Sequence, residues 1–149
     1  MNTTSGLRES RGWGVALVAL YLVLAGLPVV LAVLARPAGE NFLEELGLGA
    51  GLLGFALLSL QFVLSGRFRT VDGPFGLDIV MGFHKGMAIF ATVLILLHPV
   101  LLSLGEGNWH LFRPDTPWQV TLGKAALLLL VLVVAASLTF HKVGISYQV

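Results

Sequence analysis

The stretch from Asp78 to Leu104 constrains this chain most, because it is apolar enough to cross a membrane yet contains two histidines, His84 and His98. The two histidines lie 98 − 84 = 14 positions apart. At about 100° per residue this spacing is about 40° short of four helical turns, so both imidazoles leave the same face of one helix. They are separated by roughly 21 Å along the helix axis. Polar side chains inside a bilayer are costly, which makes the pair a candidate functional site.

The composition is that of an integral membrane protein. Of the 149 residues, 56% are hydrophobic and 11% are charged, whereas a soluble domain has about 25% charged residues. The net charge of +1 comes from scattered basic residues that form no patch, so we expect no nucleic-acid partner. The absence of cysteine excludes a disulfide, a thiolate metal site and a cysteine nucleophile.

Four apolar segments predict an all-α membrane fold with four transmembrane helices. The segments run over about residues 13–35, 46–65, 78–104 and 121–140. Pro28 lies inside the first segment and predicts a kink there. Gly47, Gly51 and Gly54 recur at helical contact spacing in the second segment, which predicts a face that packs closely against another helix. The basic, turn-rich stretch 66–77 is predicted to be a loop.

The basic residues predict the orientation of these spans in the bilayer. Six of the nine lysines and arginines fall on the side that holds both termini, and three fall on the other side. By the positive-inside rule, the termini of this multi-pass protein are expected in the cytoplasm, with the spans in the inner or plasma membrane of the cell. His84 would then lie near the cytoplasmic face and His98 toward the outer leaflet.

The histidine pair has the spacing that two stacked haems require. Neutral imidazole is a strong ligand for haem iron, and two imidazoles fill both axial positions of one iron. Two haems stacked across a membrane need ligands near each leaflet on one helix face, and His84 and His98 meet that requirement. Ala88 and Ala91 lie on the same stripe between them, so we expect these small side chains to face the flat macrocycles and leave room for them.

The run GFHKGMAIFATVLILLHPVLL combines H-x13-H with a basic residue after the first histidine, a glycine next, and proline after the second histidine. In these features it resembles the ligand helix of the ferric reductase-like transmembrane domain. That family includes ferric reductases, NADPH oxidases and related bacterial haem proteins, and the resemblance covers about Gly54 to Val149. It implies a six-helix bundle that binds two b-type haems. The third helix would supply His84 to the iron of the inner haem and His98 to that of the outer one, and the fifth helix the opposite ligands.

The same resemblance implies transmembrane electron transfer, from cytoplasmic NAD(P)H and FAD to an outer acceptor such as ferric iron or oxygen. The chain ends at Val149, where the fifth helix is expected to begin. We therefore expect a truncated domain, the membrane part of an oxidoreductase and not a complete enzyme, with FAD and NAD(P)H bound by a missing or separate domain. The opposite axial histidines would come from missing C-terminal helices or from a partner chain. Two parallel copies could also pair each histidine with its mate.

Two other functions remain open at this point. The chain could be a flavin-independent haem b membrane subunit that exchanges electrons with quinone or a partner reductase, or a haem-free membrane packing or assembly protein. A hydrolytic metal site is excluded because it needs three ligands close together. A proton or ion pathway is disfavoured because the acidic residues lie only at the ends of the spans.

The remaining polar residues have simpler interpretations. His110 is interpreted as a solvated residue of the outer loop, and His141 as a structural residue at the inner end of the fourth span. Gln61 is predicted to bond to a neighbouring helix. Arg67 and Arg69 are interpreted as charges that set the topology.

Overall fold

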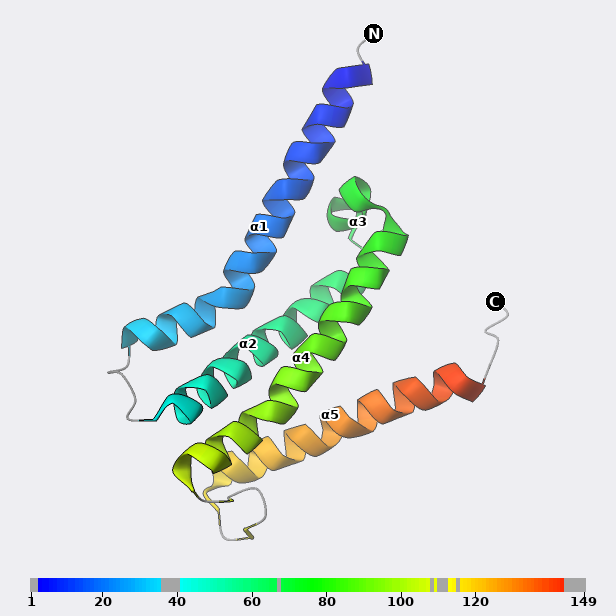
Figure 1. Cartoon of the computed structure of the whole chain (residues 1–149). Coiled ribbons are helices and arrows are strands. Elements are labelled where there is room, and N and C mark those ends of the chain that lie inside the picture. The colour runs from blue at the N-terminus through cyan, green and yellow to red at the C-terminus, as the bar shows by residue number, and fades with distance from the viewer. Residues whose placement is uncertain are drawn as a thin grey trace. The chain divides into compact units, whose positions relative to one another are not determined.

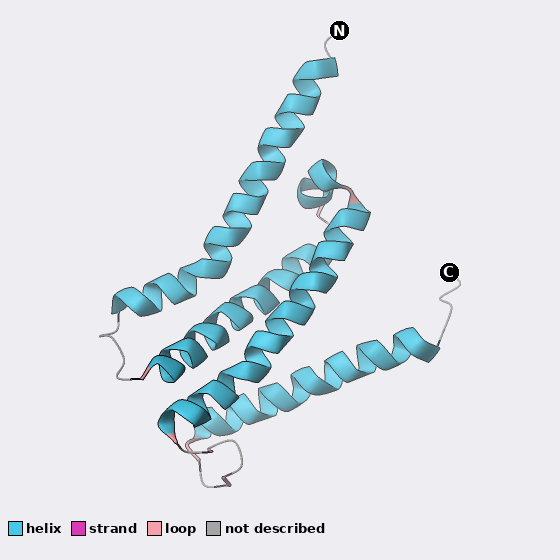
Figure 2. Ribbon diagram, viewed as in Figure 1, coloured by secondary structure: helices cyan, strands magenta, loops and turns pink. Residues whose placement is uncertain are grey.

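The computed structural model describes residues 3–35, 41–66, 68–107, 109, 113–114 and 116–143. The elements in these ranges are all helices, in the order α1 (Thr3–Ala35), α2 (Phe42–Ser65), α3 (Arg69–Phe75), α4 (Leu77–Glu106) and α5 (Trp118–Val143) (Figures 1 and 2). The described residues contain no strand. The chain divides into two compact units, residues 1–106 with α1 to α4, and residues 107–149 with α5.

Four of the helices are long and apolar enough to cross a membrane, over Gly12–Ala35, Phe42–Ser65, Leu77–Glu106 and Trp118–Ser137. The predicted all-α membrane fold with four spans is therefore confirmed, and each predicted segment lies within one of α1, α2, α4 and α5. The second helix begins four residues earlier than predicted because Asn41 caps it. The Asn41 side chain accepts a hydrogen bond from the Leu43 amide at 3.0 Å, and acidic residues in the first turn complement the helix dipole.

Helices α2 and α4 form the most extensive contact in the first unit. Glycines of α2 let the two helix backbones approach each other closely. A Cβ atom on Gly47 would lie 3.1 Å from the Leu102 amide nitrogen, and one on Gly54 would lie 2.7 Å from the side chain of Ile95. Such distances leave no space for a side chain. The packing face predicted from the glycine spacing is confirmed, since small residues let the two helix backbones approach.

The ends of this helix pair are joined as well. Asn41 Nδ2 donates a 2.7 Å hydrogen bond to the carbonyl of Gly105, at the far end of α4. Gly105 itself packs against Glu44, because a Cβ there would lie 2.9 Å from the Glu44 amide nitrogen. The start of α2 and the end of α4 therefore lie side by side, so the two helices are antiparallel.

The helix α1 packs against α2 and α3 and bends in its C-terminal part (Figure 1). Pro28 lies inside α1 and removes one backbone donor, which accounts for the predicted kink. Upstream of the bend, Ala25 of α1, Leu57 of α2 and Ala91 of α4 form a buried cluster. This cluster is the place where the three long helices of the first unit meet.

The connection between α2 and α4 differs from the prediction. The stretch 66–77 was expected to be a loop throughout, but it contains the short helix α3. The Phe68 carbonyl accepts hydrogen bonds from the amides of Val71 and Asp72, which starts the helix. Gly76, with φ of 83°, ends it and turns the chain into α4. The sequence did not predict this helix because its polar, turn-forming residues show no helical period of apolar side chains.

In the second unit, Lys124 fastens the segment before α5 to the helix. Its Nζ donates to the carbonyl of Arg113 at 2.6 Å and to the hydroxyl of Thr116 at 3.3 Å. The Pro117 carbonyl accepts hydrogen bonds from the Val120 and Thr121 amides and begins α5. Lys124, near the start of this span, therefore stabilises the position of the segment that precedes α5.

Replacing Gly54 by leucine is expected to lower the free energy of unfolding by about 1–3 kcal/mol, because the new side chain would collide with Ile95 and the Ala91 carbonyl. Gly49 lies on the same helix and a Cβ there meets nothing within 4 Å. Gly49→Leu is therefore the matched control and should leave the stability unchanged. Circular dichroism during a denaturing-detergent titration measures both. Superimposable unfolding curves for the two variants would contradict the close α2–α4 contact.

Candidate functional site

Both histidines singled out from the sequence lie on α4, which runs unbroken from Leu77 to Glu106 and includes Pro99. Their spacing of 98 − 84 = 14 residues places them on one face of this helix, roughly 21 Å apart along the axis. Each imidazole is partly buried. The described residues contain no group of three or more potential metal ligands close together, so neither histidine belongs to such a cluster there.

His98 is held by α2. Its Nδ1 lies 2.7 Å from the carbonyl oxygen of Gly47, which is 51 positions away in the sequence. A carbonyl only accepts, so Nδ1 must bear the proton that it donates. In the neutral ring the other nitrogen, Nε2, then has a free lone pair. The contact with α2 thus selects the tautomer of His98 and leaves Nε2 as the nitrogen with a free lone pair.

Gly51 makes room for this ring. A Cβ atom at Gly51 would lie 2.5 Å from Nδ1 of His98 and 2.8 Å from Cε1. Any larger residue would displace the imidazole from the Gly47 carbonyl. Gly47 and Gly51 were predicted only as packing residues, and their role as the support of His98 was missed. Only the register of α2 against α4 reveals it.

The surroundings of His84 are different. Its Nδ1 is buried and has no hydrogen-bond partner within the part of the chain that the structure describes. Gly82 and Gly86 stand on either side, and a Cβ on either would meet nothing within 4 Å. Each of these glycines is two positions from His84, about 200° around the helix, so this open space lies on the opposite face of α4 from the ring. Among the described residues, Nδ1 of His84 lacks the kind of partner that Nδ1 of His98 has.

The two alanines between the histidines have unequal positions. Ala91 is fully buried, with 0% of its surface exposed, in the cluster with Ala25 and Leu57. Ala88 is partly buried, and its carbonyl accepts a 2.7 Å hydrogen bond from the Thr92 hydroxyl. Helix packing alone accounts for the small size of Ala91. The haem-facing role predicted for Ala88 and Ala91 remains a prediction.

A polar contact between α1 and α2 lies near the His84 end of the unit. Gln61 is buried, and its Nε2 donates to the carbonyl of Leu57 at 3.0 Å and to the hydroxyl of Tyr21 at 3.4 Å. The predicted bond from Gln61 to a neighbouring helix is confirmed. The Tyr21 ring also packs edge-to-face against Phe83 of α4, with ring centroids 5.2 Å apart. Tyr21 therefore contacts α2 and α4 at once, and its partner on α4, Phe83, is next to His84 in the sequence.

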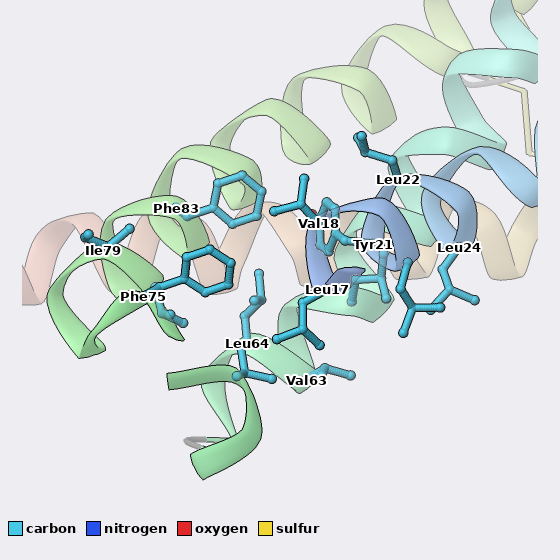
Figure 3. Close-up of a pocket in the computed structure, with 14 residues that line it drawn as sticks. Leu17, Val18, Tyr21, Leu22, Leu24, Val63, Leu64, Phe75, Ile79 and Phe83 are labelled. Carbon is cyan, nitrogen blue, oxygen red and sulfur yellow. The ribbon is translucent and has the colours of Figure 1, made fainter. Parts of the chain in front are cut away.

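An apolar pocket of about 390 Å³ lies beside this contact, between α1, α2, α3 and α4. Figure 3 shows Phe75 and Phe83 on one side of it and Leu17 and Val18 on the other. Tyr21 is the only lining residue with a polar side chain, and His84 is not among the lining residues. The pocket thus offers apolar contact and no group that could act as an acid, a base or a nucleophile at neutral pH.

Residues 50–149 match the family model described as "Ferric reductase like transmembrane component". The chain belongs to this family. The match includes both histidines, Gly51, Gly54 and Gln61, and it covers the region for which the sequence predicted the resemblance. No curated protein matches the chain, and no solved structure does.

Four other residues interpreted from the sequence of this ferric reductase-like chain fall, wholly or with their side chains, outside what the structure describes. They are His110, Arg67 and the side chains of Arg69 and His141. The interpretations given for them from the sequence therefore remain predictions.

Gly51→Ala is expected to break the hydrogen bond between His98 and Gly47, because the added methyl group would occupy the position of the ring. In the haem-free protein, ¹⁵N nuclear magnetic resonance of the histidine side chains should show His98 protonated at Nδ1. The variant should shift a large part of the population to the Nε2-protonated tautomer. Gly49→Ala on the same helix is the control and should match the unmodified protein. An unchanged His98 spectrum in Gly51→Ala would show that Gly47 does not select the tautomer.

Proposed function

We propose that this chain conducts electrons across a membrane through two b-type haems, with His84 and His98 each providing one axial ligand. The observation that supports this most strongly is the state of His98. A ring whose Nδ1–H is bound to a carbonyl, with Nε2 left free, is the usual arrangement of a metal-ligating histidine. Membership of the ferric reductase-like family supports the same conclusion.

The donor set of α4 fits this cofactor. Imidazole nitrogen is a common axial ligand of b-type haem iron. The described residues offer no cluster of three ligands that would favour a different metal site. His84 would bind the inner haem and His98 the outer one.

When bound, a haem with two axial imidazoles supplies a one-electron carrier without an open coordination position. The residues of this chain perform the remaining tasks. The Gly47 carbonyl orients His98 and increases the basicity of its Nε2. Exposed apolar residues of α4, including Ile89, Phe90 and Val93, give the helix a surface that suits lipid or further helices and excludes water.

In the proposed sites each histidine would provide one of the two protein ligands of a haem iron, so a second ligand would be needed for each haem. We propose that further helices of the protein, or a partner chain, provide these opposite ligands. The excess of basic residues on the side of the termini supports a cytoplasmic position for His84 and an outer position for His98. Electrons would then enter near His84 from a cytoplasmic donor such as a flavin domain. They would leave near His98 to an outer acceptor, for which the family description suggests ferric iron.

Absorbance spectroscopy of the detergent-purified protein tests the haem assignment. We expect a Soret band that shifts on reduction with dithionite and a sharp reduced α-band, the spectrum of six-coordinate haem b. His84→Ala and His98→Ala should each lose half of the bound haem, because each removes an axial ligand from one site. Thr92→Ala is the control within α4 and should retain all of it, since the Thr92 hydroxyl is bound to the backbone of its own helix.

The outcomes separate the competing functions. A protein without a Soret band after expression with ample haem would contradict the proposal and favour a packing or assembly protein. Full haem content in both histidine variants would show that other residues bind the cofactor.

A further inference from the structure

The His84 end of the first unit contains two buried polar atoms of complementary type. Gln61 is only 7% exposed, and its Oε1 has no hydrogen-bond partner among the described residues. Both donor contacts of this amide are made elsewhere, to Leu57 and Tyr21. The Nδ1 of His84 is buried without a partner as well. A buried acceptor and a buried potential donor each cost free energy when unpaired.

The register of α2 against α4 relates these two residues. The close contacts advance in step along the antiparallel pair: Gly105 meets Glu44, Leu102 meets Gly47, His98 meets Gly51, and Ile95 meets Gly54. His98 bonds to Gly47 in this register. Counting 14 residues toward the start of α4 leads from His98 to position 98 − 14 = 84. Counting 14 residues toward the end of the antiparallel α2 leads from Gly47 to position 47 + 14 = 61. Because 14 residues are close to four helical turns, His84 lies on the same face of α4 as His98, and Gln61 lies on the same face of α2 as Gly47. By position, Gln61 is therefore related to His84 as Gly47 is to His98.

The helices remain neighbours at this level. Leu60 and Leu64 of α2 and Val80 and Phe83 of α4 line the same pocket. Tyr21 bridges the two helices, since its hydroxyl accepts from Gln61 and its ring packs on Phe83. In this register His84 is level with Ser65, so Gln61 lies one helical turn, or about 6 Å along the axis, from the level of His84 on the facing helix.

We propose that Gln61 is the positioning residue of His84, and that its Oε1 accepts the Nδ1–H of His84 in the membrane-embedded protein, with haem or without it. This inference deepens the proposed function and rests on it for the ligand role of His84. The Gln61 side chain would thereby do for the inner ligand what the Gly47 backbone carbonyl does for the outer one. It would fix the tautomer, aim Nε2 away from α2 and increase the basicity of Nε2.

The two supports differ in kind. A backbone carbonyl at position 47 persists under any substitution that keeps the helices together, whereas the acceptor at position 61 depends on the side chain. A substitution in α2 can therefore remove the acceptor at the inner site, whereas at the outer site a substitution such as Gly51→Ala can only displace the ring from an acceptor that remains. Asp72 of α3 also has a buried carboxylate oxygen without a partner in the described part of the chain, so it is the competing acceptor.

The test is ¹⁵N nuclear magnetic resonance of the histidine side chains in the haem-free, full-length protein in lipid nanodiscs. We expect His84 to be protonated at Nδ1 in the unmodified protein. Gln61→Leu removes the acceptor at nearly constant size and should shift His84 toward the Nε2-protonated tautomer, with His98 unchanged. Gln61→Glu keeps an acceptor oxygen and should restore the original tautomer. Ser59→Ala, on the same helix, is the control because the Ser59 hydroxyl bonds only to its own helix.

These outcomes test the hydrogen bond between Gln61 and His84 without a measurement of electron transfer. A His84 tautomer that is unchanged in Gln61→Leu, or that responds to Asp72→Asn instead, would overturn the proposal. Nuclear Overhauser contacts between the Gln61 amide protons and the His84 ring in the unmodified protein would support it even if Gln61→Leu failed to fold, and their absence would count against it. Because these spectra are recorded without haem, failure of haem binding leaves this test valid. Where haem binds, Gln61→Leu should weaken the His84 site by about 10- to 100-fold and spare the His98 site.

Discussion

The close approach of α2 to α4 is the contact on which the rest of the first unit depends. Glycines of α2 allow it, because a Cβ at Gly51 or Gly54 would overlap with side chains of α4. The same approach brings the Gly47 carbonyl within 2.7 Å of His98. Association of membrane helices relies on such packing, since lipid tails are as apolar as leucine. In this protein one packing contact thus both joins two helices and fixes the ring of His98.

This arrangement divides the histidine face of α4 into two environments. At the His98 end the helices are closest, and the ring is fixed by backbone groups. At the His84 end the neighbouring positions hold Gln61 and Tyr21, and an apolar pocket lies between the helices. Under the proposed function, the two histidines would therefore be haem ligands that differ in how firmly each ring is held. Such a difference in surroundings is the means by which proteins give two similar haems different reduction potentials.

Much of the fold could be predicted from the sequence, because membrane spans have a strong local signal. Apolar length predicted four helices, and residue spacing placed His84 and His98 on one face of α4. The support of His98 by Gly47 could not be predicted, since it depends on the register between two helices that are separated in the chain. The helix α3 was missed because short polar helices lack an apolar period. Ala91 lies in a helix-packing cluster, which a stripe on one helix cannot distinguish from a surface that faces a cofactor.

Electron transfer across a sealed vesicle tests the central claim most directly. The purified protein is reconstituted into liposomes that enclose a ferric chelate, dithionite is added outside, and formation of the ferrous chelate is followed. The proposed pathway predicts reduction of the enclosed iron well above the rate in protein-free liposomes, and a return to that background in His84→Ala and in His98→Ala alike. Reduction at the full rate in either histidine variant, or at the background rate in the unmodified haem-loaded protein, would contradict it.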